Sequence, residues 1–495
     1  MIAMASFRRK SQPSVVIIGG GLGGIAAAVK LKKRGIGTFT IFERSAGPGG
    51  VWWDNRYPGV EVDVSSHLYS YSFKRFDWSR THADQAELQR YLQEVIDEFD
   101  LREHFRFETK VERVEWDGSR GYHVWTSDGE GLYCRAVISA VGLLNEPRYP
   151  DWPGLADFAG PVFHSARWDG DADLAGKNVA VVGSGSTAVQ IVPSIAGEVR
   201  RVTLFQREPG WVFPKGDREF SHEERRVLGR RLAQRRERLR LFWQIERGQL
   251  LGSIHRPGTK LNTQRERQAR AYIARVFKDR PDLRVAVTPT YPYAGKRPIL
   301  SSAFYPSLLR DNVELVPYAV ASVTSDAVVD TRGVAHPVDV LVLATGFQPT
   351  KFLASFKLIG RNGRPLSQVW RNDPQAFLGI TVPEFPNFYM LYGPNTNGGE
   401  IVSQLERQAE YAVRTIGQLR NRRIAAIDVR PSFYVKYNRW IQRSIAKTSW
   451  VLSNNYYKSE SGRVVTQWPY GAIIYSALTK LLRRASQSIE FVKAK

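Results

Sequence analysis

The clearest chemistry in this sequence lies in a glycine-rich turn, where Gly19, Gly21 and Gly24 follow an apolar run at residues 15–18. Glycines at this spacing form a turn too tight for side chains, and they let the amides at the start of a helix face a pyrophosphate. Glu43 ends the next apolar run, where a carboxylate can accept a hydrogen bond from a ribose 2′-hydroxyl. Together these residues favour a dinucleotide-binding site over a purely structural turn.

A second turn of the same kind follows residues 178–182, and its members are Gly183, Gly185, Ser186, Thr187 and Ala188. Arg207 follows Gly183 at the same distance along the chain as Glu43 follows Gly19. A guanidinium can grip a 2′-phosphate in bidentate geometry, whereas a carboxylate would repel it. The first turn therefore suits FAD or NAD and the second suits NADP. The alternative for Arg207 is one more surface arginine on a basic protein.

Strands and helices in alternation must position the two turns. Apolar runs before each glycine turn predict strands, and each turn is followed by a helical segment and a second strand at residues 39–43 or 202–205. Further apolar runs end at Gly142 and Gly346, so both halves close in the same way. We therefore predict an α/β fold with two Rossmann-like dinucleotide-binding domains, one for FAD and one for NADPH.

The domain boundaries follow from this repeat. Residues 1–150 form the first part of the FAD-binding domain, residues 151–346 form the NADPH-binding domain, and residues 347–495 return to the first domain and cover the substrate and cofactors. Within the first part, apolar spacing predicts a helix at residues 88–99 and strands at residues 107–116, 122–126 and 132–140.

Residues 216–280 are dense in arginine and glutamate, with leucines and aromatic residues among them, and predict a helical insertion in the second domain. A basic amphipathic helix can lie on a membrane surface. A solvated helical face is the usual form of such a pattern, and it is the interpretation that we favour.

The composition narrows the classes of function. A formal net charge of +23 allows a nucleic-acid or membrane partner. Because no nucleic-acid module is recognisable, we favour solubility and attraction of anionic cofactors. The single cysteine, Cys134, excludes an internal disulfide, a thiolate metal cluster and the cysteine pair of a flavin disulfide reductase. No metal site is predicted.

The sequence also predicts a location. Residues 1–14 are basic and polar, and the apolar run after them is too short for the core of a secretion signal. No run reaches the ~20 apolar residues of a membrane-spanning helix. We expect a cytoplasmic enzyme, and the sequence does not indicate an oligomeric state.

Two longer motifs resemble the fingerprints of the type I Baeyer–Villiger monooxygenases. Residues 158–169 fill every fixed position of Phe-x-Gly-x-x-x-His-(Thr/Ser)-x-x-Trp-(Pro/Asp), with Phe158, Gly160, His164, Trp168 and Asp169. Residues 49–52 read Gly-Gly-Val-Trp and lead to Asp63, which is similar to the second signature of the family. The resemblance covers roughly residues 13–469.

The resemblance implies tightly bound FAD, NADPH as hydride donor, dioxygen as oxidant, and conversion of a small-molecule ketone into an ester or lactone through a flavin peroxide. By position, Asp63 and Arg297 match the catalytic aspartate and arginine. Lys296 and Arg207 match the contacts to the 2′-phosphate, and His164 matches a histidine assigned to domain movement. The remaining implied cofactor contacts are Gly50, Val51, Trp52, Asp63, Tyr69, Val111, Arg297 and Trp450.

An arginine–aspartate pair suits the chemistry of a peroxide that attacks a carbonyl group. A peroxide anion that attacks a carbonyl moves its charge onto a tetrahedral oxygen, and a permanently charged donor stabilises both states. An adjacent carboxylate holds the arginine in place and tunes the local proton balance.

Other interpretations stay open. Glu208 stands where relatives usually carry a small hydroxyl residue, and a second anion there would weaken the preference for NADP if it points inward. An oxygenase acting on nitrogen or sulfur could use the same cofactors. A more distant alternative is a redox-sensing nucleotide-binding protein that binds nucleic acid or a membrane.

Overall fold

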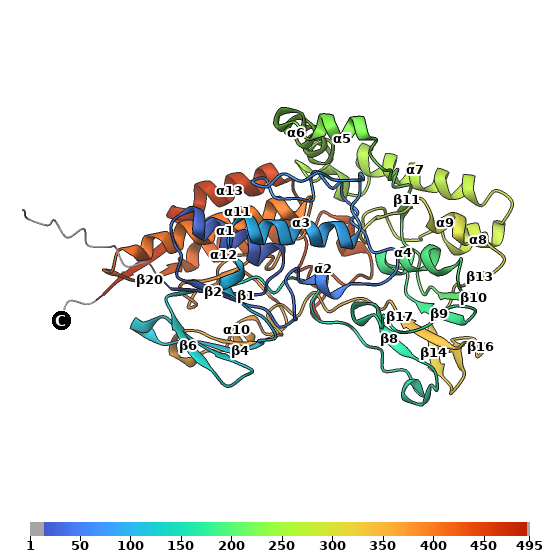
Figure 1. Ribbon diagram of the computed structural model, residues 1–495, viewed down its shortest axis with the longest axis horizontal. Coiled ribbons are helices and arrows are strands. Elements are labelled where there is room, and N and C mark those ends of the chain that lie inside the picture. The colour runs from blue at the N-terminus through green and yellow to red at the C-terminus, as the bar shows by residue number, and fades with distance from the viewer. Residues whose placement is uncertain (1–13, 493–495) are drawn as a thin grey trace, which may run out of the picture.

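The backbone of the computed structural model, which describes residues 14–492, is built around two parallel five-stranded sheets (Figure 1). The first sheet has the order β19-β7-β1-β2-β3, with the strands Phe388–Met390, Ala136–Ser139, Val15–Ile18, Phe39–Phe42 and Phe105–Arg106. Its central strand β1 pairs in parallel with β2 and β7, so that Val15 lies opposite both Phe39 and Ala136. Strands far apart in the sequence therefore share one sheet.

Both faces of the first sheet are covered, which explains why its central strands are apolar throughout. Val15 and Ile17 point into a core that they share with α1 (Leu22–Lys33) and α11 (Ile401–Ile416). Val16 and Ile18 point into a second core, beneath a mostly antiparallel sheet. The strands of that sheet are β4 (Val111–Trp116), β5 (Tyr122–Thr126), β6 (Gly131–Cys134) and β18 (Lys357–Ile359).

The second sheet repeats this plan. Its order is β13-β10-β9-β17-β8, with the strands Val313–Val316, Arg201–Phe205, Asn178–Val182, Val340–Leu343 and Val162–His164. Val179 and Val181 pack toward the helix α4 (Ser186–Ile195). Ala180 and Val182 pack toward the small sheet of β14 (Val320–Val323), β15 (Ala327–Asp330) and β16 (Ala335–Pro337).

The remaining elements connect and cover the two sheets. The helices are α2 (Val51–Asp54), α3 (Gln85–Glu98), α5 (His222–Leu228), α6 (Arg231–Gln249), α7 (Lys260–Val276), α8 (Pro281–Ala286), α9 (Phe304–Ser307), α10 (Leu366–Trp370), α12 (Pro431–Ile445) and α13 (Ala472–Ala485). The strands are β11 (Val212–Phe213), β12 (Ile299–Leu300), β20 (Ile424–Val429) and β21 (Gln487–Phe491).

Two of the predicted strands need correction. The apolar run at residues 132–140 is two strands, because the chain bends at Arg135 and passes from β6 in the antiparallel sheet to β7 in the parallel one. The backbone amide of Arg135 bonds to the carbonyl of Ser14, 2.9 Å away, and its side chain donates to Ile424. The strand predicted at residues 107–116 begins only at Val111.

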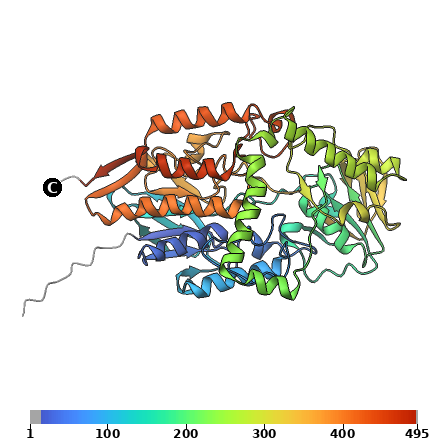
Figure 2. The same cartoon turned by 90° about the horizontal axis from the view of Figure 1, so that it is seen from above.

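The predicted helical insertion is present as α5, α6 and α7, and it reaches back to the first sheet's side of the molecule. In Figure 2, α6 (green) passes the beginning of α13 (red). Glu246 of α6 is buried and accepts hydrogen bonds from Ala472 (2.8 Å) and Ile473 (3.0 Å) at the start of α13. Arg238 donates to the carbonyl of His67 at 2.8 Å. In residues 14–492, no helix is both long and apolar enough to cross a bilayer.

Candidate active site

A cavity of about 470 Å³ lies where the carboxyl ends of the two parallel sheets meet. Such strand ends are the usual ligand sites of open α/β sheets. The turn after β1 contributes Gly19 and Gly21, and the turn after β9 contributes Gly185, Ser186 and Thr187. The two predicted nucleotide turns therefore face one continuous space.

The first turn is shaped by close backbone contacts. A Cβ added to Gly24 would lie 2.0 Å from the carbonyl oxygen of Gly19, which itself has a positive φ of 101°. Gly21 pairs with Gly49, and a Cβ on Gly50 would lie 3.1 Å from the Gly21 Cα. A second glycine segment thus lies against the first, and the backbone of Gly19 and Gly21 lines the cavity beside the Leu22 side chain.

Glu43 is buried at the end of β2 and lines the cavity. Its carboxylate accepts hydrogen bonds from the amides of Gly20 (2.8 Å) and Ser45 (2.9 Å). Burial raises the pKa of this carboxyl, and the two amide hydrogen bonds oppose that rise. Because each carboxylate oxygen can accept more than one hydrogen bond, Glu43 keeps acceptor capacity for a ribose hydroxyl.

Four other predicted cofactor contacts line the same cavity, namely Val51, Trp52, Tyr69 and Val111. The indole Nε1 of Trp52 donates to the Tyr69 hydroxyl at 3.2 Å, and the two rings meet edge to face. The Trp52 carbonyl accepts a hydrogen bond from Gln85 at 2.6 Å. The aromatic pair is therefore held from α3 and does not depend on a ligand for its position.

The second turn differs from the first in its openness. Gly183 has a φ of 144°, and a Cβ there would lie 2.3 Å from the Ala344 carbonyl oxygen. At Gly185 a Cβ would meet no heavy atom within 4 Å. Gly183 and the buried Ala188 do not line the cavity, whereas the backbone of Gly185 does.

Asp63 and Arg297 meet at the cavity from different parts of the chain. The Asp63 carboxylate accepts from Nη2 (2.5 Å) and Nε (3.1 Å) of Arg297 with the same oxygen. Burial would raise the pKa of Asp63, but the guanidinium outweighs it and the pKa falls below its usual value. The neighbouring carboxylate raises the pKa of Arg297 further. Both side chains are therefore charged over the whole physiological pH range.

Lys296, Arg207 and Glu208 lie outside this cavity lining. Lys296 forms an ion pair with Glu208, so the acid that departs from the family pattern is bound to a predicted phosphate contact. Arg207 is exposed and forms no ion pair within the described part of the chain.

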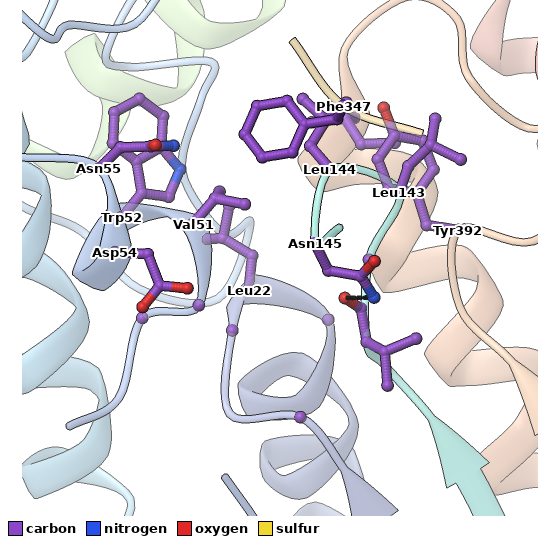
Figure 3. Close-up of a pocket in the computed structure, with 18 of the residues that line it drawn as sticks. Leu22, Val51, Trp52, Asp54, Asn55, Leu143, Leu144, Asn145, Phe347 and Tyr392 are labelled. Atoms are coloured by element: carbon purple, nitrogen blue, oxygen red, sulfur yellow. Dashed lines mark hydrogen bonds between the residues drawn. The ribbon is translucent and has the colours of Figure 1, made fainter. Parts of the chain in front are cut away.

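One wall of the cavity is apolar and was not predicted from the sequence. Figure 3 shows Leu143, Leu144, Phe347 and Tyr392 on one side, across from Val51 and Trp52 of α2. Asn145 Nδ2 donates to the Val141 carbonyl at 3.0 Å and holds the loop that carries the leucines. Gly142 and Gly346, which follow β7 and β17, are the sequence signal for part of this wall, because the loops after these strands carry Leu143, Leu144 and Phe347.

Trp450 does not line the cavity. It is buried, and its ring packs against His255 and Tyr457 with centroid distances of 4.6 and 6.4 Å. Its segment reaches the site indirectly, since Ser453 and Asn455 donate to the carbonyl of Gly295, close to Arg297. A contact between Trp450 and a cofactor stays a prediction.

The residues of the long fingerprint lie behind the cavity, in the second sheet and its flanks. Phe158 is buried, a Cβ on Gly160 would lie 2.1 Å from the Asp339 carbonyl oxygen, Trp168 packs on Phe163, and Asp169 caps the amide of Asp171. Their contacts are structural in kind, and none of them touches the space that a ligand could fill.

His164 has a specific position within that fingerprint. Its Nδ1 accepts from the Ala166 amide at 3.1 Å, so Nε2 carries the proton and donates to the Gly346 carbonyl at 3.0 Å. The same carbonyl accepts from the Arg148 amide at 2.8 Å. Burial lowers the pKa of His164 and keeps it neutral. The His164 ring therefore stabilises the two segments that connect the sheets, one at Arg148 and one at Gly346.

We expect His164→Ala to lower the free energy of unfolding by about 1–3 kcal/mol, because the buried Ala166 amide loses its acceptor. Denaturant unfolding monitored by circular dichroism measures this loss. His222→Ala, at an exposed position on α5, serves as the control. Equal free energies of unfolding for the two variants would contradict the proposed structural role of His164.

Both glycine turns have the shape that a dinucleotide requires. The first offers a glycine turn with close backbone contacts at the start of α1 and a buried acceptor at the end of the next strand, as an FAD pyrophosphate and ribose require. The second offers an accessible backbone at the start of α4, where Gly185 faces open space. Both fit the groups that the sequence predicted.

Comparisons with known proteins agree with this geometry. Residues 16–227 match the family described as "Pyridine nucleotide-disulphide oxidoreductase". The chain is 40% identical to a Baeyer–Villiger monooxygenase of Streptomyces coelicolor over 465 residues, which cover 92% of this chain and 88% of that relative. The chain belongs to the Baeyer–Villiger monooxygenase family.

Solved structures of this family's fold show the same architecture. Cyclohexanone monooxygenase from Rhodococcus sp. Phi1 bound to NADP⁺ aligns with a TM-score of 0.88 and 28% identity, covering 97% of this chain and 100% of that one. A complex of OTEMO with FAD and NADP aligns with a TM-score of 0.87 and 25% identity, again over 97% of this chain and 100% of that one. The predicted fold class is confirmed.

This Baeyer–Villiger monooxygenase is an NADPH-dependent flavin enzyme, and the predicted cofactors FAD and NADPH are confirmed. The residues that match the disulphide oxidoreductase family, 16–227, include both glycine turns. A redox-active cysteine pair is impossible here, since the chain has one cysteine, Cys134, which is buried in β6.

Proposed function

We propose that this Baeyer–Villiger monooxygenase inserts one oxygen atom of dioxygen next to the carbonyl group of a small-molecule ketone, giving an ester or lactone. In balance, ketone, dioxygen, NADPH and a proton yield ester, NADP⁺ and water. The observation that carries the proposal is the Asp63–Arg297 pair in a cavity lined by both nucleotide turns.

The proposed division of labour follows the two sheets. Residues 1–150 and 347–495 hold FAD, with Gly19, Gly21, Gly24 and Glu43 at the pyrophosphate and ribose. Residues 151–346 hold NADPH through the second glycine turn. Bound FAD, once reduced by NADPH, would supply the electrons that activate dioxygen, and the transferred oxygen atom comes from dioxygen.

Arg297 stabilises the negative charge that develops when oxygen attacks the carbonyl. Its guanidinium is permanently charged and is held by Asp63, so it is a preorganised cationic donor for that charge. Asp63 engages Nε and Nη2, so Nη1 is left without a partner among the described residues. The aspartate thus fixes the arginine and leaves the N–H groups of Nη1 for the reacting oxygen.

The apolar wall orients a substrate that has few polar groups. Leu143, Leu144 and Phe347 offer surface to a hydrocarbon skeleton, and we expect a carbonyl oxygen to approach the guanidinium of Arg297. An apolar wall beside precisely placed polar groups is a usual feature of small-molecule sites.

The test offers a cyclic ketone and a thioether in parallel to FAD-loaded enzyme with NADPH and ¹⁸O-labelled dioxygen. We expect one labelled oxygen in the ring of the lactone. Labelled sulfoxide with no lactone, across a panel of ketones, would instead identify a sulfur oxygenase. NADPH consumption without any substrate-dependent product would contradict both.

A further inference from the structure

We propose that Glu208 sets the coenzyme preference of this enzyme, because it competes with the 2′-phosphate of NADPH for Lys296 and offers an acceptor to the ribose hydroxyl of NADH. The inference rests on the nicotinamide cofactor alone. It does not depend on which substrate is oxygenated.

Glu208 lies at the position of the fold that distinguishes NADPH from NADH. It follows Arg207 just beyond the end of β10, the second strand of the nucleotide-binding unit. In folds of this kind, the residue at the end of that strand meets the ribose 2′-position. Ser184, within the glycine turn, donates to the Glu208 carbonyl at 2.6 Å, which ties this segment to the turn itself.

The carboxylate of Glu208 forms an ion pair with Lys296, the residue whose ammonium group a 2′-phosphate would need. Lys296 is paired with Glu208, and the two side chains retain 23% and 30% of their exposure. The Lys296 ammonium also lies 5.2 Å from the ring centroid of Tyr291, whose hydroxyl donates to the Pro209 carbonyl at 3.0 Å. Two contacts therefore hold the ammonium at the end of β10.

The electrostatic consequence has a definite sign. A 2′-phosphate brings close to two negative charges beside a carboxylate, and it must displace that carboxylate from Lys296. Repulsion between charges about 4 Å apart in a partly buried site corresponds to roughly tenfold or more in affinity. NADH carries no such charge, and its 2′-hydroxyl can donate to Glu208.

The experiment measures binding of NADP⁺ and NAD⁺ to oxidised, FAD-loaded enzyme by isothermal titration calorimetry. In Glu208→Gln, the Kd for NADP⁺ should fall about tenfold, and the Kd for NAD⁺ should rise or stay unchanged. Rates of flavin reduction at subsaturating NADPH and NADH should shift in the same directions.

Glu314→Gln is a matched control, because Glu314 also pairs with a basic residue of β10, at 3.1 Å from Arg201, but at the opposite end of the strand. Its loss removes the same charge from the same sheet and should leave both Kd values unchanged.

Weaker NADP⁺ binding in Glu208→Gln would overturn the proposal, since it would mean that Glu208 holds Lys296 in place for the phosphate. An equal gain in Glu314→Gln would also overturn it, because the effect would then reflect net charge. Circular dichroism of each variant confirms that a change in affinity is not a loss of fold.

Discussion

Arg297→Ala is expected to reduce the rate of ester formation by about 10²–10³-fold, the usual cost of removing one oxyanion donor. The change leaves both glycine turns intact, so FAD should stay bound and NADPH should still reduce it. The enzyme would then consume NADPH and dioxygen without oxygenating the ketone. Product formation by gas chromatography, measured beside flavin reduction by stopped-flow absorbance, separates the two steps.

Two companion variants sharpen this test. Arg297→Lys keeps a positive charge but loses the planar donor pair that Asp63 accepts, so it should recover only part of the rate. Arg280→Ala removes an exposed arginine of the same half of the chain, which pairs with Asp282 at 2.7 Å, and should have no effect. Ester formation at the native rate in Arg297→Ala would refute the role given to this residue.

Gly24→Val is expected to yield protein that is purified without its yellow cofactor. Even the first carbon of a side chain at Gly24 would lie 2.0 Å from the Gly19 carbonyl oxygen, and this neighbour is backbone that cannot rotate away. The turn must widen, and the amides at the start of α1 lose their alignment on the pyrophosphate. The flavin-to-protein absorbance ratio measures the loss.

Gly417→Ala provides the matched control, because Gly417 has ordinary helical backbone angles and a Cβ there would meet no heavy atom within 4 Å. Far-ultraviolet circular dichroism shows whether the apoprotein of Gly24→Val is folded. Full flavin occupancy in a folded Gly24→Val would refute the assignment of this turn to FAD.

Much of the fold was accessible from the sequence because glycine spacing is a local signal. Gly19 and Gly24 fix a turn through contacts within a few residues, and the strand and helix that flank it follow at once. The division of residues 132–140 at Arg135 was not accessible, because the apolar run continues across the bend and only the partner strands decide which sheet each half joins.

Some residues of the site were also predictable from the sequence, and others were not. Asp63 and Arg297 were predicted from motifs, and the structure brings them together. The apolar wall was not predicted, because Leu143, Phe347 and Tyr392 come from three loops that have no periodicity. Trp450 was predicted to contact a cofactor, but its side chain is buried in the protein core and does not line the cavity.

The position of β19 in the first sheet has a consequence during synthesis on the ribosome. Strand β7 pairs with β1 on one side and with β19 on the other, yet β19 begins only at Phe388. At ordinary translation speeds, β7 must wait on the order of ten to fifty seconds for this neighbour. During that interval its outer edge is an unpaired template for other nascent chains, so recovery of native enzyme should depend on growth temperature and chaperone supply.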